Sequence, residues 1–136
     1  MTGQSDGLPS VGETIAGKYR LERVLGEGGM GIVMAAEHLH LGQRVAIKFM
    51  DRQASAEEGR VARFQREAWA AGKIQSDHVC RVSDVGRLDS GIAYMVMEYL
   101  EGEDLESLAR RGALPLHLAI DYLLQAGEAM AEAHKH

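Results

Sequence analysis

What this sequence lacks argues against several kinds of protein. Cys80 is the single cysteine, so no disulfide can form within the chain, and this usage fits a reducing cytoplasm. With a net charge of −5, the chain has no basic excess of the kind that nucleic-acid binding needs. No apolar run approaches the ~20 residues of a membrane-spanning helix, and the N-terminus lacks the basic and apolar segments of a signal peptide. We therefore expect a cytoplasmic location, which is compatible with an anchor elsewhere in a longer parent chain.

The composition is that of a folded domain. Hydrophobic residues make up 46% and charged residues 26% of the 136 positions, which is typical of globular chains. This length corresponds to one domain. Residues 1–17 are rich in Gly, Ser, Thr and Asp and predict a flexible leader, whereas a folded unit is expected over residues 18–136.

Hydrophobic periodicity predicts five strands and three helices. The strands are expected at 19–25, 32–37, 44–50, 79–87 and 92–99, and the helices at 55–74, 104–112 and from 115 onward. Ser55, followed by Glu58, fits a capping box at the start of the first helix. Because short turns join most of the strands, we expect an α+β fold. It would consist of a five-stranded antiparallel sheet carrying one helix, followed by two C-terminal helices.

Residues 26–33 spell G-x-G-x-x-G-x-V, with glycines at 26, 28 and 31. A glycine-rich reversal lets backbone N–H groups approach phosphate oxygens, because no Cβ stands in the way. Dinucleotide-binding units use the same string, followed at once by a helix and about 20 positions on by an acidic residue, for which Asp51 qualifies. A plain turn is a third interpretation. Ile32 and Val33 favour a strand after the glycines, against the dinucleotide unit.

Lys48 ends the apolar run Val45-Ala46-Ile47 on an expected strand. A lysine on an edge strand that reaches solvent is one interpretation; behind a glycine loop, a phosphate-contacting lysine is the other. Such an ammonium group has to be held by a carboxylate on a neighbouring element. Glu67 lies near the apolar stripe of the next helix and could serve, although a solvated charge is the usual role of a helical glutamate.

The expected strand at 92–99 runs into a polar connector. Extended backbone of this kind could hydrogen-bond a flat heterocycle beside a cleft; alternatively, it is a core strand that leaves the sheet. Asp104 is placed to cap the short helix that follows.

Taken together, the glycine loop, Lys48, Glu67 and the segment 95–102 resemble the N-terminal lobe of eukaryotic-type Ser/Thr protein kinases, particularly the bacterial ones. The resemblance covers residues 19–136, about half of such a domain. It implies an N-lobe at 18–100, a hinge at 98–103 and the start of a C-lobe at 104–136. It also implies ATP with Mg²⁺ as cofactor and transfer of the γ-phosphate to protein Ser or Thr hydroxyls.

The resemblance also implies roles for single residues. Nucleotide contacts are expected from Leu25, Gly26, Glu27, Gly28, Gly29, Met30, Gly31, Val33, Ala46, Lys48, Met97, Glu98, Leu100 and Asp104. The three glycines of the motif would cover the phosphates, and Lys48 would contact the α- and β-phosphates and pair with Glu67.

The remaining roles concern adenine and ribose. Val33 and Ala46 would sandwich adenine, and Met97 would be the gatekeeper. Glu98 and Leu100 would face the adenine edge from the hinge. Asp104 would correspond to the ribose-contacting acid of the family.

The sequence also departs from the family pattern. Ser76-Asp77 stands where many relatives carry His-Pro, and no H-R-D or D-F-G segment occurs in the 136 residues. The catalytic-base Asp and the Mg²⁺-binding Asn and Asp are therefore missing, so we expect this chain alone to be inactive and to bind nucleotide weakly. The alternative is a natural, non-catalytic nucleotide-binding or interaction module.

The last part of the sequence adds two expectations. The apolar face of the helix at 115–134 would pack against a C-lobe in a longer kinase; here it would be exposed, cover the sheet or drive self-association. His134 and His136 are interpreted as solvated residues near a chain end, and no metal site is expected.

Overall fold

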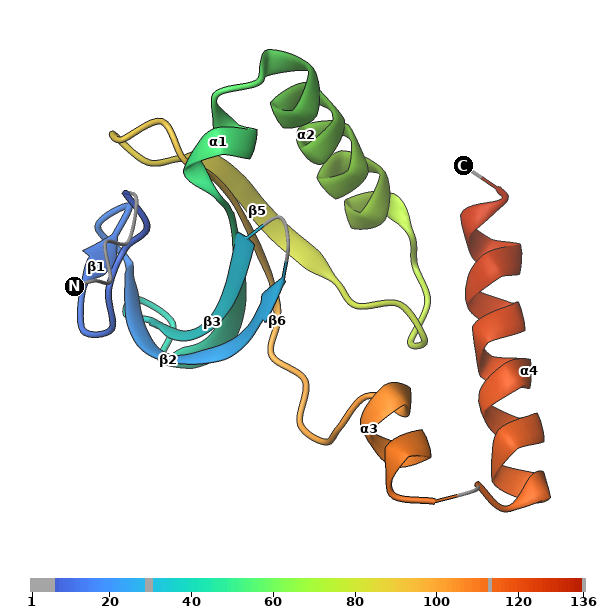
Figure 1. The fold of residues 1–136 in the computed structure, drawn as a ribbon. Helices are drawn as coiled ribbons and strands as arrows, with labels where there is room; N and C mark the ends of the chain where they lie inside the picture. The colour runs from blue at the N-terminus through green and yellow to red at the C-terminus, as the bar shows by residue number, and fades with distance from the viewer. Residues whose placement is uncertain (1–6, 29–30, 113, 136) are drawn as a thin grey trace.

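The computed structural model describes residues 7–28, 31–112 and 114–135. Its elements are β1 (Thr14–Ile15), β2 (Tyr19–Gly28), β3 (Gly31–His38), β4 (Gln43–Met50), α1 (Arg52–Ser55), α2 (Glu58–Lys73), β5 (Val82–Arg87), β6 (Ala93–Glu98), α3 (Leu105–Arg110) and α4 (Leu116–Ala133). The strands form one antiparallel sheet in the order β1-β2-β3-β4-β6-β5, with α2 beside it and α3 and α4 beyond β6 (Figure 1). The predicted α+β class is confirmed, with six strands in this part of the chain where five were expected.

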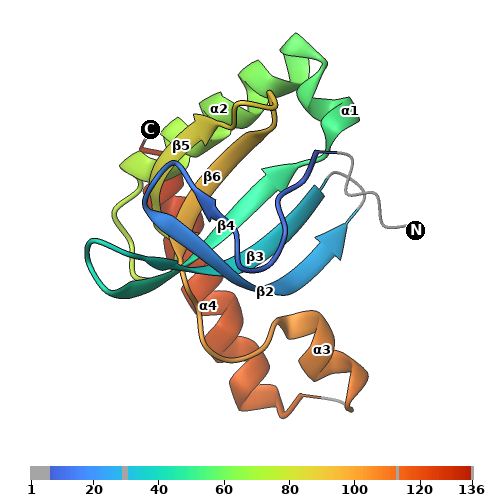
Figure 2. The ribbon, with the colours of Figure 1, turned by 90° about the vertical axis from the view of Figure 1, so that its left-hand side faces the viewer.

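The sheet is strongly curled around its core. Tyr19 on β2 donates its hydroxyl hydrogen to Asp84 Oδ2 on β5 at 3.1 Å, although three strands separate β2 from β5 in the sheet order. The inside of the curl is filled by Leu21, Met34 and other fully buried apolar side chains. Burial, together with the hydrogen bond to Asp84, raises the pKa of Tyr19 to about 12. The curl is visible in Figures 1 and 2.

The sixth strand corrects the expected leader, because its described part is anchored on the sheet. Thr14 and Ile15 form β1 and pair with Arg20 and Tyr19 of β2, and Ile15 is 4% exposed. The reversal between the two strands uses a left-handed residue, Ala16, with φ of 51°. A two-residue strand is too short to produce an alternating pattern, so periodicity does not predict it.

The helix expected at 55–74 corresponds to α2, but the predicted capping box is wrong because Ser55 belongs to a separate short helix, α1. Ser55 ends α1, where Asp51 caps the helix by accepting from the Ala54 N–H at 2.6 Å. The buried Ser55 hydroxyl instead accepts from the Ala93 N–H of β6, at 3.2 Å. The Ser55 oxygen that would accept a hydrogen bond in a local capping box therefore accepts one from a distant strand. The N-cap of α2 is Glu57, without a side-chain hydrogen bond.

Strand register places the residues of interest on one face of the sheet. Val33 lies opposite Lys48, Ala46 lies opposite Met97, and Lys48 lies opposite Met95. Directly paired residues share a face, so all of these positions lie on the side away from the curled core. The helix α2 packs on the same face, through Val61, Phe64 and Ala68.

The C-terminal helices pack differently from the rest of the chain. Neither α3 nor α4 has a buried residue. One link to the sheet region is the polar contact between His78 Nε2 and Glu128 Oε2, at 2.9 Å. Within residues 7–28, 31–112 and 114–135, no helix combines the length and apolar character needed to cross a bilayer.

Candidate nucleotide-binding site

The glycine loop joins β2 to β3 and borders a pocket of about 440 Å³. Gly31 is required by packing, because a Cβ there would overlap the Phe49 backbone carbonyl. Gly26 and Gly28 differ, since a Cβ at either would meet no atom of the described residues within 4 Å, chain neighbours aside. The folded chain thus does not itself require glycine at 26 and 28. Glycine at these two positions would be required by a ligand that approaches the backbone closely. Gly29 and Met30 lie outside the described residues.

Lys48 lines this pocket and a second one of about 410 Å³ on the α2 side. The second pocket is also lined by Glu67, Arg63 and Arg60, with Phe64 and Met50 as apolar walls. Lys48 and Glu67 thus border the same cavity. The cause is the packing of Phe64 against the Lys48 face of the sheet, which turns this side of α2 toward the lysine.

The expected ion pair between Lys48 and Glu67 is not formed in this structure. Glu67 Oε1 accepts from Arg63 Nε at 3.1 Å, one helical turn away. Among the described residues, Lys48 has no carboxylate within 4.0 Å. Arg63 is the residue that sequence reasoning missed. It stands four positions before Glu67, a spacing that predicts an ion pair on one face of a helix.

The apolar residues expected around adenine lie on the same face of the sheet as Lys48. Ala46 is 6% exposed, Val33 is half-buried, and Met97 lies opposite Ala46 on the neighbouring strand. Leu25 lies on β2 and is exposed, as is Glu27, which borders the glycine-loop pocket.

The hinge residues line a different pocket from Lys48. The Glu98 N–H donates to the Arg81 carbonyl at 2.9 Å, and the Glu98 carbonyl lies 3.8 Å from Cys80 Sγ. Glu98 and Cys80, together with Leu100 and Tyr122, border a pocket of about 320 Å³. Burial raises the pKa of the Cys80 thiol, which disfavours the reactive thiolate.

Asp104 caps α3, as expected. Its Oδ1 accepts from the Ser107 backbone N–H at 2.7 Å, and this hydrogen bond lowers the pKa of the carboxyl. A contact with ribose remains a prediction.

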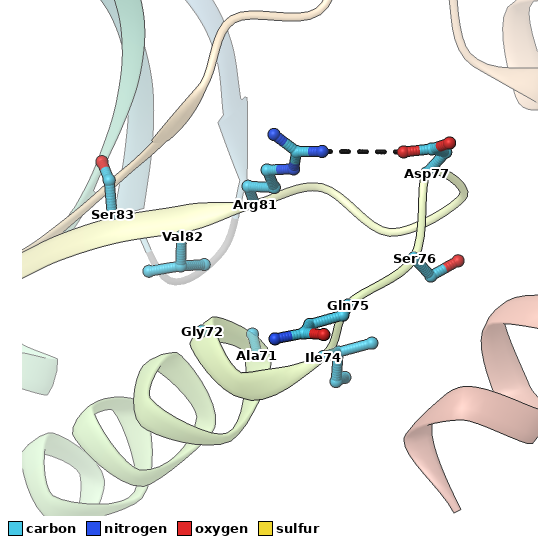
Figure 3. A pocket seen from close by; sticks show the side chains of 9 residues that line it. All are labelled: Ala71, Gly72, Ile74, Gln75, Ser76, Asp77, Arg81, Val82 and Ser83. Carbon is cyan, nitrogen blue, oxygen red and sulfur yellow. Dashed lines mark ion pairs between the residues drawn. The ribbon is translucent and has the colours of Figure 1, made fainter.

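A further pocket lies apart from the site residues described above. It measures about 570 Å³ and lies between the C-terminal end of α2 and the start of β5, where Asp77 and Arg81 form an ion pair at 3.6 Å (Figure 3). Neither Lys48 nor the glycine loop borders it. In the described part of the chain, no three His, Cys, Asp or Glu side chains are grouped closely enough to hold a metal ion; His136 lies outside that part.

The strand that follows the glycines decides between the two nucleotide folds. Gly31–His38 is β3, where a dinucleotide-binding unit would place a helix. The sequence model of the protein kinase domain matches residues 19–136. The chain belongs to the protein kinase family.

Curated relatives of this kinase-family chain are bacterial Ser/Thr protein kinases. The chain is 39% identical to serine/threonine-protein kinase pkn3 of Myxococcus xanthus over 125 residues, covering 91% of the chain and 23% of that protein. It is 38% identical to serine/threonine-protein kinase PknA of Mycobacterium tuberculosis over 131 residues, covering 93% of the chain and 30% of that protein. The chain thus spans less than a third of the length of these relatives.

Solved structures agree with the family assignment. The crystal structure of the PknI kinase domain of M. tuberculosis superposes with a TM-score of 0.81 at 28% identity. The match covers 94% of this kinase-family chain and 51% of that one. The chain therefore corresponds to about half of a kinase domain.

Proposed function

We propose that this chain is the ATP-binding part of a bacterial Ser/Thr protein kinase that transfers the γ-phosphate of ATP to protein Ser or Thr hydroxyls. The observation that carries the proposal is the position of Lys48, which borders both the glycine-loop pocket and the pocket that contains Glu67. A phosphate chain under the glycine loop would lie next to this ammonium group.

In this proposal the loop residues 25–31 hold the phosphates and Lys48 neutralises them. The open space at Gly26 and Gly28 supports close contact between their backbone and the phosphate oxygens. Glu67 would leave Arg63 and pair with Lys48 when nucleotide is bound. This exchange needs a rearrangement of exposed side chains only, since the Arg63–Glu67 pair is largely solvated.

Adenine would lie between Val33 and Ala46, next to Met97, with its edge toward the backbone of Glu98 and Leu100. The exposed carboxylate of Asp104 would reach the ribose. Mg²⁺ would neutralise the phosphates further, but the family's Mg²⁺ ligands have no counterpart among these 136 residues. We place this nucleotide binding in the cytoplasm.

The chain alone should not phosphorylate proteins. No H-R-D or D-F-G segment is present to orient an acceptor hydroxyl or hold the metal. A general protein substrate should therefore gain no labelled phosphate above background. Incorporation that disappears with Lys48→Met would contradict this part of the proposal.

Calorimetric titration with ATP, with and without Mg²⁺, tests the nucleotide site. We expect weak binding that falls by about tenfold or more in Lys48→Met, because a charged phosphate contact is lost. Lys73→Met is the matched control: it removes the same charge from an exposed lysine that borders neither pocket. Equal losses in both variants, or a preference for a nicotinamide dinucleotide, would refute the site. Tight Mg²⁺-dependent binding would instead favour a non-catalytic nucleotide-binding module.

A further inference from the structure

Trp69 is the single tryptophan of the chain, and it lies on the outer side of α2. Its side chain is 67% exposed, whereas Val61, Phe64 and Ala68 of the same helix are buried against the sheet. The Lys73 ammonium nitrogen lies 3.5 Å from the centroid of its ring. An exposed tryptophan that already holds a cation at its ring is an unusual surface feature, because Trp is highly buried on average.

The cations of α2 divide into two pairs. Arg60 and Arg63 lie toward the Lys48 pocket and form ion pairs with Glu57 at 2.8 Å and Glu67 at 3.1 Å. Arg66 and Lys73, in contrast, have no acidic partner anywhere in residues 7–28, 31–112 and 114–135. They stand three positions before and four positions after Trp69, so they flank it on one helix face.

The charges on this face are positive, whereas the chain as a whole is negative. The net charge is −5, and acids satisfy the other two cations of the helix. The face defined by Arg66, Trp69 and Lys73 carries two positive charges around an aromatic ring, and neither has an acidic partner in the described part of the chain. Trp and Arg are the residues most enriched among those that dominate protein-binding energies.

We propose that the Arg66–Trp69–Lys73 face is a docking surface for an acidic peptide segment of a partner protein. An apolar side chain of the segment would cover the Trp69 ring, and its carboxylates would pair with Arg66 and Lys73. The proposal does not depend on nucleotide binding, because none of these three residues borders the Lys48 pockets. It places the partner on the side of α2 that the sheet does not cover (Figures 1 and 2).

The experiment uses the intrinsic fluorescence of Trp69, which reports on this face alone. The probe is a short synthetic peptide with a central phenylalanine between runs of glutamate, titrated into the whole chain at low salt without nucleotide. We expect a saturable change in emission and reduced quenching by acrylamide. The response should weaken as salt is added. The same peptide with glutamine in place of glutamate should give no response.

Variants test whether the peptide binds to this face or is attracted by the positive charge of the helix as a whole. Binding of a fluorescently labelled peptide, measured by anisotropy, should weaken about fivefold in Arg66→Gln and in Lys73→Gln. It should weaken about thirtyfold or more in Trp69→Ala. Arg60→Gln is the matched control on the other side of the helix and should bind like the unaltered chain. Circular dichroism verifies that the exposed substitutions leave the fold intact.

Three outcomes would overturn the proposal. The first is no response of Trp69 to the glutamate peptide at low salt. The second is an equal loss of binding in Arg60→Gln and Arg66→Gln, which would show an attraction to the helix as a whole. The third is stronger binding to vesicles containing phosphatidylglycerol than to the peptide, which would assign the face to an anionic membrane surface.

Discussion

The sheet with α2 and the pair of helices α3 and α4 differ in how they are held together. The curled sheet buries Phe49, Ile47 and Val96 completely. On α4, Leu116 remains 75% and Leu123 72% exposed. The first region therefore closes a hydrophobic core from its own residues, whereas α4 presents an apolar face that nothing within residues 7–28, 31–112 and 114–135 covers. A helix can thus be well formed locally without any burial of its apolar stripe.

The largest expected difference comes from truncating one apolar side chain in each region. Phe49→Ala should lower the free energy of unfolding by about 3–5 kcal/mol, because it opens a cavity in a fully buried site. Leu123→Ala should change it by less than about 0.5 kcal/mol. Urea unfolding followed by circular dichroism measures both. Similar losses for the two variants would show that α4 contributes to a core in solution.

The exposed face of α4 should make the chain self-associate. Leu116, Ile120 and Leu123 lie on this face, and each loses about 1.5–3 kcal/mol when left in water instead of being buried. We expect light scattering after gel filtration to show species larger than 14.8 kDa at high concentration. Leu123→Glu should shift the population toward monomer. A stable monomer of the unaltered chain at all concentrations would contradict this prediction.

A smaller effect on stability should follow from the hydrogen bond between Tyr19 and Asp84, which closes the curl of the sheet. The pKa of Tyr19 is about 12 in the folded chain, against an ordinary value near 10. The folded state therefore retains the proton more strongly than the unfolded state, so this stabilisation is complete below about pH 10 and is lost between about pH 10 and 12. Melting temperatures should fall more steeply over that range than in Tyr19→Phe. Parallel curves for the two proteins would rule out Tyr19 as the source.

The smallest effect is expected at the turn before β2. Ala16 has a φ of 51°, a left-handed conformation that glycine adopts without strain. Ala16→Gly should therefore raise the free energy of unfolding by about 0.5–1 kcal/mol, whereas Gly42→Ala, at φ of 67° in another turn, should lower it by a similar amount. Thermal melts of both variants provide the comparison.

The sequence predicted the sheet strands β2 to β6 because each has a run of alternating or apolar residues. It placed Lys48 on a strand and Glu67 on the following helix, and the order of motifs in the family predicts an ion pair between them that this structure does not form. What it could not predict depends on competition between partners. The Ser55 hydroxyl could cap a helix or accept a hydrogen bond from the distant Ala93 N–H. Glu67 could pair with Lys48 or with the nearby Arg63. Local sequence shows both choices and does not rank them.

The hydrogen bond between Tyr19 and Asp84 also bears on how the chain folds. Its two residues lie 65 positions apart, and one belongs to the second strand while the other belongs to the fifth. During synthesis, β2 to β4 leave the ribosome well before Asp84, so they can pair as a meander but cannot close the curl. The closing contact therefore has a large loop-closure cost and is expected late in folding. Until that step, the apolar inner face of the sheet is open to solvent and to other chains.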